Sequence, residues 1–247
     1  MFPIRDHNPS GRTPYVNYAL ILLNVAIFAL GWLLFPGPDG QWVLYSQWGL
    51  VPNRLMAGGG VETLLTSMFL HGGLMHLAGN MLFLWIFGDN LEDMLGHIRY
   101  LFFYLVSGLG AGALQIIEDP ASNIPMVGAS GAIAGVMGAY LLLFPKARVD
   151  VLLIIVIFFR IFPIPAWLVL GFWLGFQIVN SSLLGGGGDG VAYMAHIGGF
   201  FAGLLLILPL WLFRGGPAFW RRTHGVPPHP EAQYKYRRSR IPPTRRR

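Results

Sequence analysis

The sequence Gly128-Ala129-Ser130-Gly131, followed by the small-residue run from Ala132 to Ala139, opens an apolar segment that ends at Phe144-Pro145. A serine among small residues at the start of a membrane helix is a candidate nucleophile. The first N–H groups of a helix have no partner inside the helix and carry the positive end of its dipole. Such a serine also needs a base and donors for an oxyanion, which must come from elsewhere in the chain.

The composition indicates an integral membrane protein. The chain has 247 residues, of which 54% are hydrophobic and 11% charged, against about 25% charged in soluble domains. The mean hydropathy is +0.55. The absence of cysteine excludes disulfides and thiolate metal sites. Ten of the 17 Lys and Arg lie at or beyond Arg214, so the positive charge belongs to a tail and does not indicate a nucleic-acid-binding domain.

The predicted fold is all-α, a polytopic bundle of six transmembrane helices, because six mostly apolar segments approach the roughly 20 residues that cross a bilayer. Residues 1–14 are predicted to be a disordered cytoplasmic tail, 15–213 the six-span domain, and 214–247 a disordered Pro- and Arg-rich cytoplasmic tail. The predicted spans are 16–35, about 70–87, 100–117, 130–144, 161–179 and 191–213.

Two segments fit neither a span nor an ordinary loop. Residues 41–66 are rich in aromatic residues and weakly amphipathic, which suits a loop in the headgroup zone. Residues 151–159 are nine apolar residues, too few to cross a bilayer. They are read as an interfacial element, with one long broken helix over 149–179 as the alternative.

Basic residues predict the orientation. With the N-terminus inside, the inner segments hold 16 of the 17 Lys and Arg, and only Arg54 is outside. This distribution favours six spans with both termini in the cytoplasm, in the cell (inner) membrane. The basic tail is also suited to anionic lipid of the bilayer, at about 1 kcal/mol per basic residue.

Four polar residues share one depth in the predicted topology. His76, Ser130 and His196 each follow the outer end of an inward-running span by a few residues, and Asn80 lies one turn deeper. His76 and Asn80 are four apart on one helix face and are candidate oxyanion donors with the Ser130 N–H. His196 is the candidate base. Since no Asp or Glu lies in a predicted span, this is a Ser-His dyad.

Glycines on two spans predict close helix packing. Gly131 and Gly135 in the fourth span, and Gly199 and Gly203 in the sixth, are small-x-x-x-small pairs. Gly199 follows His196 by three residues, so it lies on nearly the same face. Contact between these glycine faces would bring Ser130 and His196 together.

Each residue alone has a simpler structural interpretation, such as packing or an inter-helix hydrogen bond. Asn24, Gln115 and Gln177 have no matching partner at the right depth and are read as such bonds. His71 is a possible supporting residue. His76 and Asn80 lack the further ligands that a metal site requires, so no metal is predicted. The prediction of a Ser-His dyad therefore rests on the combination of Ser130, His196, His76 and Asn80 at one depth.

These motifs together resemble the rhomboid intramembrane serine proteases over about residues 15–213. They are Gly128-Ala129-Ser130-Gly131, His71 to His76 with Asn80, and Ala195-His196-Ile197-Gly198-Gly199. The resemblance implies cleavage of a transmembrane substrate near its extracytoplasmic end, with Ser130 as nucleophile, His196 as general base, and no cofactor. It also implies a mobile cap at Ser181–Gly190 and a lateral gate at about 161–179.

The sequence departs from the family pattern at two places. The first loop lacks the Trp-Arg pair of some members. The tyrosine that in some members stacks on the histidine is Ala134 here, so His196 must be oriented by other groups, such as Tyr193 or packing.

Two alternatives differ in class from a protease. A catalytically silent relative would bind transmembrane helices as a chaperone or scaffold, and the intact set of polar residues argues against it. A transporter would carry ionisable residues through the bilayer and often an inverted repeat, and neither is visible in the sequence.

Overall fold

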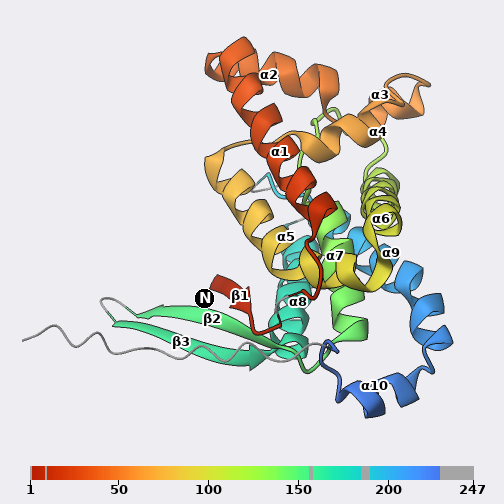
Figure 1. Ribbon diagram of the computed structural model, residues 1–247. Helices are drawn as coiled ribbons and strands as arrows, with labels where there is room; N and C mark the ends of the chain where they lie inside the picture. Colours follow the sequence, from red (N-terminus) through yellow and green to blue (C-terminus); the bar gives the residue numbers. More distant parts are fainter. Residues whose placement is uncertain (1, 9, 156–157, 185–189, 229–247) are drawn as a thin grey trace, which may run out of the picture.

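The computed structural model describes residues 2–8, 10–155, 158–184 and 190–228. Most of the chain is helical (Figure 1). The helices that are short or lie between longer ones are α2 (Gly37–Trp48), α3 (Pro52–Met56), α4 (Thr63–Thr66), η1 (Ser67–Phe69) and α10 (Pro217–Thr223). The long helices are α1 (Tyr15–Leu34), α5 (Leu74–Leu95), α6 (His97–Glu118), α7 (Ser130–Leu143), α8 (Ala166–Leu184) and α9 (Tyr193–Phe213).

The prediction of a helical membrane protein is confirmed, whereas the count of six spans stays a prediction. Within the described residues, α1, α6, α8 and α9 are each long and apolar enough to cross a membrane. The α4–η1 segment and α5 pass the same test as one pair bent by 93°, which gives up to five spans. The fourth predicted span, over 130–144, corresponds to α7, which has 14 residues. At 1.5 Å per residue it is about 21 Å long, shorter than the roughly 30 Å hydrocarbon core.

The short helix α7 lies at the centre of the bundle, in contact with α5, α6, α8 and α9 (Figure 1). Every residue from Gly131 to Tyr140 is buried. The neighbouring helices therefore cover α7 along its length, which explains how an apolar helix too short to span a bilayer is accommodated.

Glycines allow α7 and α9 to touch backbone to backbone. A Cβ added at Gly199 would collide with the carbonyl oxygen of Gly131, and one at Gly203 would collide with that of Gly135. On another side of α7, a Cβ at Gly135 would collide with Ser107 of α6. We call the α7–α9 contact at these four glycines the glycine seam. It has no room for a side chain.

A three-stranded antiparallel sheet corrects the all-α prediction. Its strands are β1 (Phe2–Asp6), β2 (Arg148–Ile155) and β3 (Phe158–Pro165), in the order β1-β2-β3. The sheet and α10 lie at one end of the molecule, and α2, α3 and α4 at the other (Figure 1).

The sheet also tests the prediction made for residues 149–179. The broken helix over 149–179 is wrong, because 148–155 and 158–165 form a hairpin and α8 begins only at Ala166. A run rich in β-branched and aromatic residues fits a strand, and Pro163 and Pro165 are tolerated because β3 is an edge strand.

The disordered tail predicted for residues 1–14 is wrong for Phe2–Asp6, which pair with β2. Asp150 on β2 holds this strand through Arg5 Nε at 2.7 Å and His7 Nε2 at 2.6 Å. In the C-terminal tail, Pro217–Thr223 forms α10. The prediction for residues 229–247 lies outside the described residues, as does that for 185–189 of the loop before α9.

Asp6 at the end of β1 joins the sheet to the end of α7. Its Oδ2 accepts hydrogen bonds from Tyr140 Oη of α7 at 2.9 Å and from Asn90 Nδ2 of α5 at 2.8 Å. Burial of the carboxyl group, with Asp89 nearby, raises the pKa of Asp6 to about 8. The C-terminal end of α7 is thus anchored by a proton-sensitive contact.

Candidate active site

The turn before α7 brings Ser130 against α5. Gly128 has φ +138°, a backbone conformation that favours glycine. A Cβ at this position would also lie 2.9 Å from the ring of His76 and 3.4 Å from Ser130 Oγ. The Gly128 N–H donates to the carbonyl of Ser67 at 2.9 Å. Glycine at 128 therefore serves both the turn and the close approach of the two side chains.

Ser130 and His196 form a hydrogen bond between two helices. His196 Nε2 on α9 is 2.8 Å from Ser130 Oγ at the start of α7. The glycine seam explains this distance, since Gly131 and Gly199 place the two helix backbones in contact next to these residues. A hydroxyl and an imidazole in this geometry are competent for proton transfer.

The other ring nitrogen of His196 has a partner that the sequence did not predict. Nδ1 is 2.8 Å from Oε1 of Gln177 on α8. Gln177 is only 5% exposed, and its Nε2 donates to the carbonyl of Trp173 at 3.3 Å. The Trp173 ring lies 5.8 Å from the His196 ring, tilted by 36°. The predicted inter-helix hydrogen bond of Gln177 is confirmed, but the prediction that it has no partner at the depth of the site is wrong, because its partner is His196.

His76 and Asn80 of α5 share one cavity with Ser130 and His196. Asn80 is 8% exposed, and its Nδ2 has no hydrogen-bond partner among the residues that the structure describes. A buried amide donor without a partner normally costs about 1–3 kcal/mol, so its retention calls for an explanation. An oxygen atom bound beside Ser130 would supply the missing acceptor.

This cavity has a volume of about 1310 Å³. Besides the four polar residues it is lined by apolar side chains of α5, α6 and α8, and by the segment between α6 and α7. Glu118, Asp119 and Ser122 bring charged and polar groups to its border. The cavity is large enough for an extended peptide segment, and its polar border gives water a route to Ser130.

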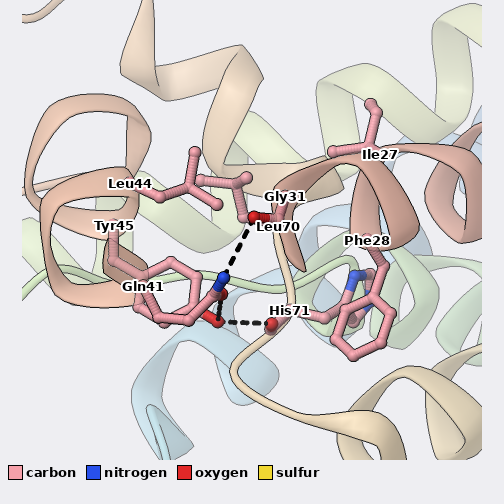
Figure 2. A pocket seen from close by; sticks show the side chains of 8 residues that line it. All are labelled: Ile27, Phe28, Gly31, Gln41, Leu44, Tyr45, Leu70 and His71. Atoms are coloured by element: carbon pink, nitrogen blue, oxygen red, sulfur yellow. Dashed lines mark hydrogen bonds between the residues drawn. The ribbon is translucent and has the colours of Figure 1, made fainter. Parts of the chain in front are cut away.

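His71 lies outside this cavity and lines a separate small one of about 10 Å³, roughly the volume of one water molecule (Figure 2). Its carbonyl accepts a hydrogen bond from Tyr45 Oη at 2.9 Å, and Gln41 Nε2 bonds the carbonyl of Gly31 at 3.1 Å (Figure 2). The His71 ring meets the His76 ring edge-on at 5.2 Å. His71 therefore lies next to the site, with its ring against that of His76.

Other predicted polar residues are distributed as follows. Asn24 Nδ2 bonds the carbonyl of Leu20 in its own helix at 2.7 Å. Gln115 Oε1 accepts from the Ala195 N–H at 3.2 Å, which joins α6 to α9 directly beside His196. In the part of the chain that the structure describes, no three His, Cys, Asp or Glu residues are grouped as metal ligands would be.

Comparison with known proteins identifies the family. The family model of the rhomboid domain matches residues 58–213. This chain belongs to the rhomboid family. The chain is similar to the mitochondrial rhomboid protein 1 of Saccharomyces cerevisiae, with 30% identity over 198 residues, or 76% of this chain and 51% of the relative. It is also similar to the rhomboid protease GluP of Bacillus subtilis, with 33% identity over 196 residues, or 79% of this chain and 36% of the relative.

This rhomboid spans about half or less of the length of those two relatives. The putative rhomboid protease YdcA of Bacillus subtilis is 35% identical over 124 residues, which is 50% of this chain and 62% of that relative. Membership of a family with named proteases supports a protease-type function in a membrane.

Proposed function

We propose that this rhomboid is an intramembrane serine endopeptidase that cleaves transmembrane segments of membrane proteins near their extracytoplasmic end. The observation that carries the proposal is the 2.8 Å contact between Ser130 Oγ and His196 Nε2, made by two different helices inside an accessible cavity. Family membership supports the same reaction class.

In the proposed reaction, Ser130 Oγ bonds to the carbonyl carbon of the scissile peptide while its proton passes to His196 Nε2. The Ser130 N–H, His76 and Asn80 Nδ2 donate to the resulting oxyanion. The C–N bond then breaks, and the imidazolium gives its proton to the leaving amine. Water attacks the acyl-enzyme, again losing a proton to His196, and releases the carboxylic acid and free Ser130.

The proposed topology has six spans, counting α5 with its bent N-terminal segment and the enclosed helix α7. Both termini are proposed to be cytoplasmic, on the strength of the distribution of basic residues. The sheet, with Arg148, Arg160 and the end of α7, then faces the cytoplasm, and the Ser130 cavity faces the extracytoplasmic side. The protein is proposed to act in the cell (inner) membrane.

The test uses the purified full-length protein in liposomes with a panel of single-span substrates. Ser130→Ala and His196→Ala should each lower cleavage by a factor on the order of 10⁶ relative to wild type. Ser107→Ala is the matched control, because Ser107 is a second buried serine against α7 and its removal leaves the dyad intact. Wild-type activity in either dyad variant would refute the mechanism.

The same experiment separates the protease from a silent scaffold. An active-site fluorophosphonate should label the wild-type chain and the Ser107→Ala variant, but not Ser130→Ala. A chain that binds transmembrane segments without labelling or cleavage would be the scaffold. Sequencing the new termini of cleaved substrates would locate the scissile bond.

A further inference from the structure

Gln177 approaches His196 from the side opposite Ser130. The two contacts of the imidazole are both 2.8 Å long: Nε2 to Ser130 Oγ, and Nδ1 to Gln177 Oε1. Three helices therefore meet at one ring, since Ser130 belongs to α7, His196 to α9 and Gln177 to α8. The dyad predicted from the sequence is a chain of three side chains in the structure.

The orientation of the Gln177 amide follows from its second hydrogen bond. Its nitrogen donates to the Trp173 carbonyl at 3.3 Å, and a carbonyl oxygen can only accept. The amide oxygen therefore faces His196. Because that oxygen also only accepts, the bond to His196 requires a proton on Nδ1.

A proton on Nδ1 determines the role of Nε2. In a neutral imidazole only one nitrogen carries hydrogen, so Nε2 presents its lone pair to the Ser130 hydroxyl. This is the tautomer that a general base acting on Ser130 requires. After proton transfer both nitrogens carry hydrogen, and Gln177 Oε1 accepts from the imidazolium in a charge-assisted bond.

Trp173 restricts the ring further. It lies one turn before Gln177 on the same face of α8, 5.8 Å from the His196 ring and 6.2 Å from that of Phe200. Position 134, next to the dyad on α7, carries only the methyl group of an alanine. The aromatic neighbour of His196 in this chain thus comes from α8, together with the hydrogen-bond acceptor.

We propose that Gln177 is a positioning residue of the hydrolysis, which fixes His196 in the Nδ1–H tautomer and stabilises the imidazolium formed when Ser130 attacks. This inference rests on the proposed protease function. It assigns to α8 a direct part in the chemistry, through an acceptor that the Ser-His pair itself lacks.

The test compares Gln177→Leu, Gln177→Glu and the control Asn180→Leu in the full-length protein in liposomes. Leucine has a similar volume and no acceptor, whereas glutamate keeps an acceptor. Asn180 is the matched control, because its Nδ2 makes the same kind of bond, to the Phe176 carbonyl at 2.7 Å, from a half-buried position on the same helix. The measurements are kcat and KM for a single-span substrate, the rate of fluorophosphonate labelling, and Tm.

Gln177→Leu should lower kcat and the labelling rate about 10- to 100-fold, with KM changed less than about twofold. The kcat of Gln177→Glu should stay within about tenfold of the wild-type value. The kcat of Asn180→Leu should equal the wild-type value. The inference is overturned if Gln177→Leu keeps the wild-type kcat, or if the Leu and Glu variants lose activity equally. It is also overturned if the fall in kcat is accompanied by a matching fall in Tm, because the loss would then reflect unfolding. Ser130→Ala run in parallel separates the two proposals. If wild type and Ser130→Ala behave alike, the protease function fails and the inference with it.

Discussion

The two ends of α7 differ in how their polar groups are satisfied. At the N-terminal end, Ser130 faces a cavity of about 1310 Å³, and the nearby Asn80 Nδ2 has no partner among the described residues. At the C-terminal end, ten residues away, Tyr140 is fully buried and donates to Asp6 at 2.9 Å. The N-terminal, open end of α7 thus borders a cavity where the chemistry is proposed, and its C-terminal, closed end is buried and anchored to β1.

This difference shows how a small membrane protein can hold a polar cavity. The glycine seam and the Tyr140–Asp6 contact hold α7 at positions away from the Ser130 cavity. At the open end, Asn80 Nδ2 is then available as a donor to a reacting peptide.

Apart from the dyad variants, the largest effect is expected in the glycine seam, from Gly199→Ala. The added Cβ collides with the Gly131 carbonyl, so α9 must move and separate His196 from Ser130. Overpacking of this kind costs about 1–3 kcal/mol of stability, and a displacement of about 1 Å can lower activity 100-fold. Thermal unfolding and substrate cleavage measure the two effects.

Gly171→Ala on α8 is the control for the seam. A Cβ there meets no heavy atom within 4 Å in the described part of the chain, so alanine should raise stability by up to about 1 kcal/mol and leave cleavage unchanged. Equal behaviour of the two alanine variants would contradict the packing account.

Asn80→Leu tests the open end. Losing one oxyanion donor should lower kcat up to about 100-fold, the mild end of the usual range because two other donors are proposed. The same change removes a buried donor without a partner, so the unfolding free energy should rise, by about 1 kcal/mol.

Asn24→Leu on α1 is its control. That side chain bonds the carbonyl of Leu20 and lies beside Tyr104 of α6, outside the lining of the Ser130 cavity, so cleavage should stay near the wild-type rate. A fall in stability without a fall in kcat for Asn80→Leu would mean that Asn80 is a structural residue.

Asp6→Asn tests the closed end and has the smallest expected effect on cleavage per folded molecule. The pKa of Asp6 is raised to about 8 in the fold by burial, so the folded chain keeps this proton while the unfolded chain, with a pKa of about 3.9, loses it. The contribution of Asp6 to stability is therefore complete below about pH 4 and lost as the pH rises to about 8. Thermal unfolding between pH 5 and 8.5 should show this fall in wild type and a flatter profile in Asp6→Asn.

Asp150→Asn separates this effect from general damage to the sheet. Burial alone would raise the pKa of Asp150, but the bonds from Arg5 and His7 lower it below its usual value. Its titration lies below that of Asp6, so this variant should lower stability and keep the fall between pH 5 and 8.5. An identical profile for both variants would rule out Asp6 as the titrating group.

The sequence predicted the residues of the candidate site more completely than it predicted the fold. Ser130, His196, His76 and Asn80 were selected by depth and spacing, and the structure brings all four to one cavity. The Gln177 contact was missed because the direction in which a helix presents a side chain depends on packing that one sequence does not specify. Strand β1 was missed because it pairs with a strand about 145 residues away, and such pairing has no local signal. The number of spans is hard to decide from length, because α7 has only 14 residues. The minimum length for crossing a bilayer applies to a helix that faces lipid, and α7 is covered by other helices.

The glycine seam has a consequence for motion in this protein. Helices whose backbones touch cannot slide or rotate past each other without first separating, so we expect α7 and α9 to move together. Any opening that admits a large substrate must therefore come from displacement of other helices around this pair. The hydroxyl and the imidazole stay in register throughout such a movement.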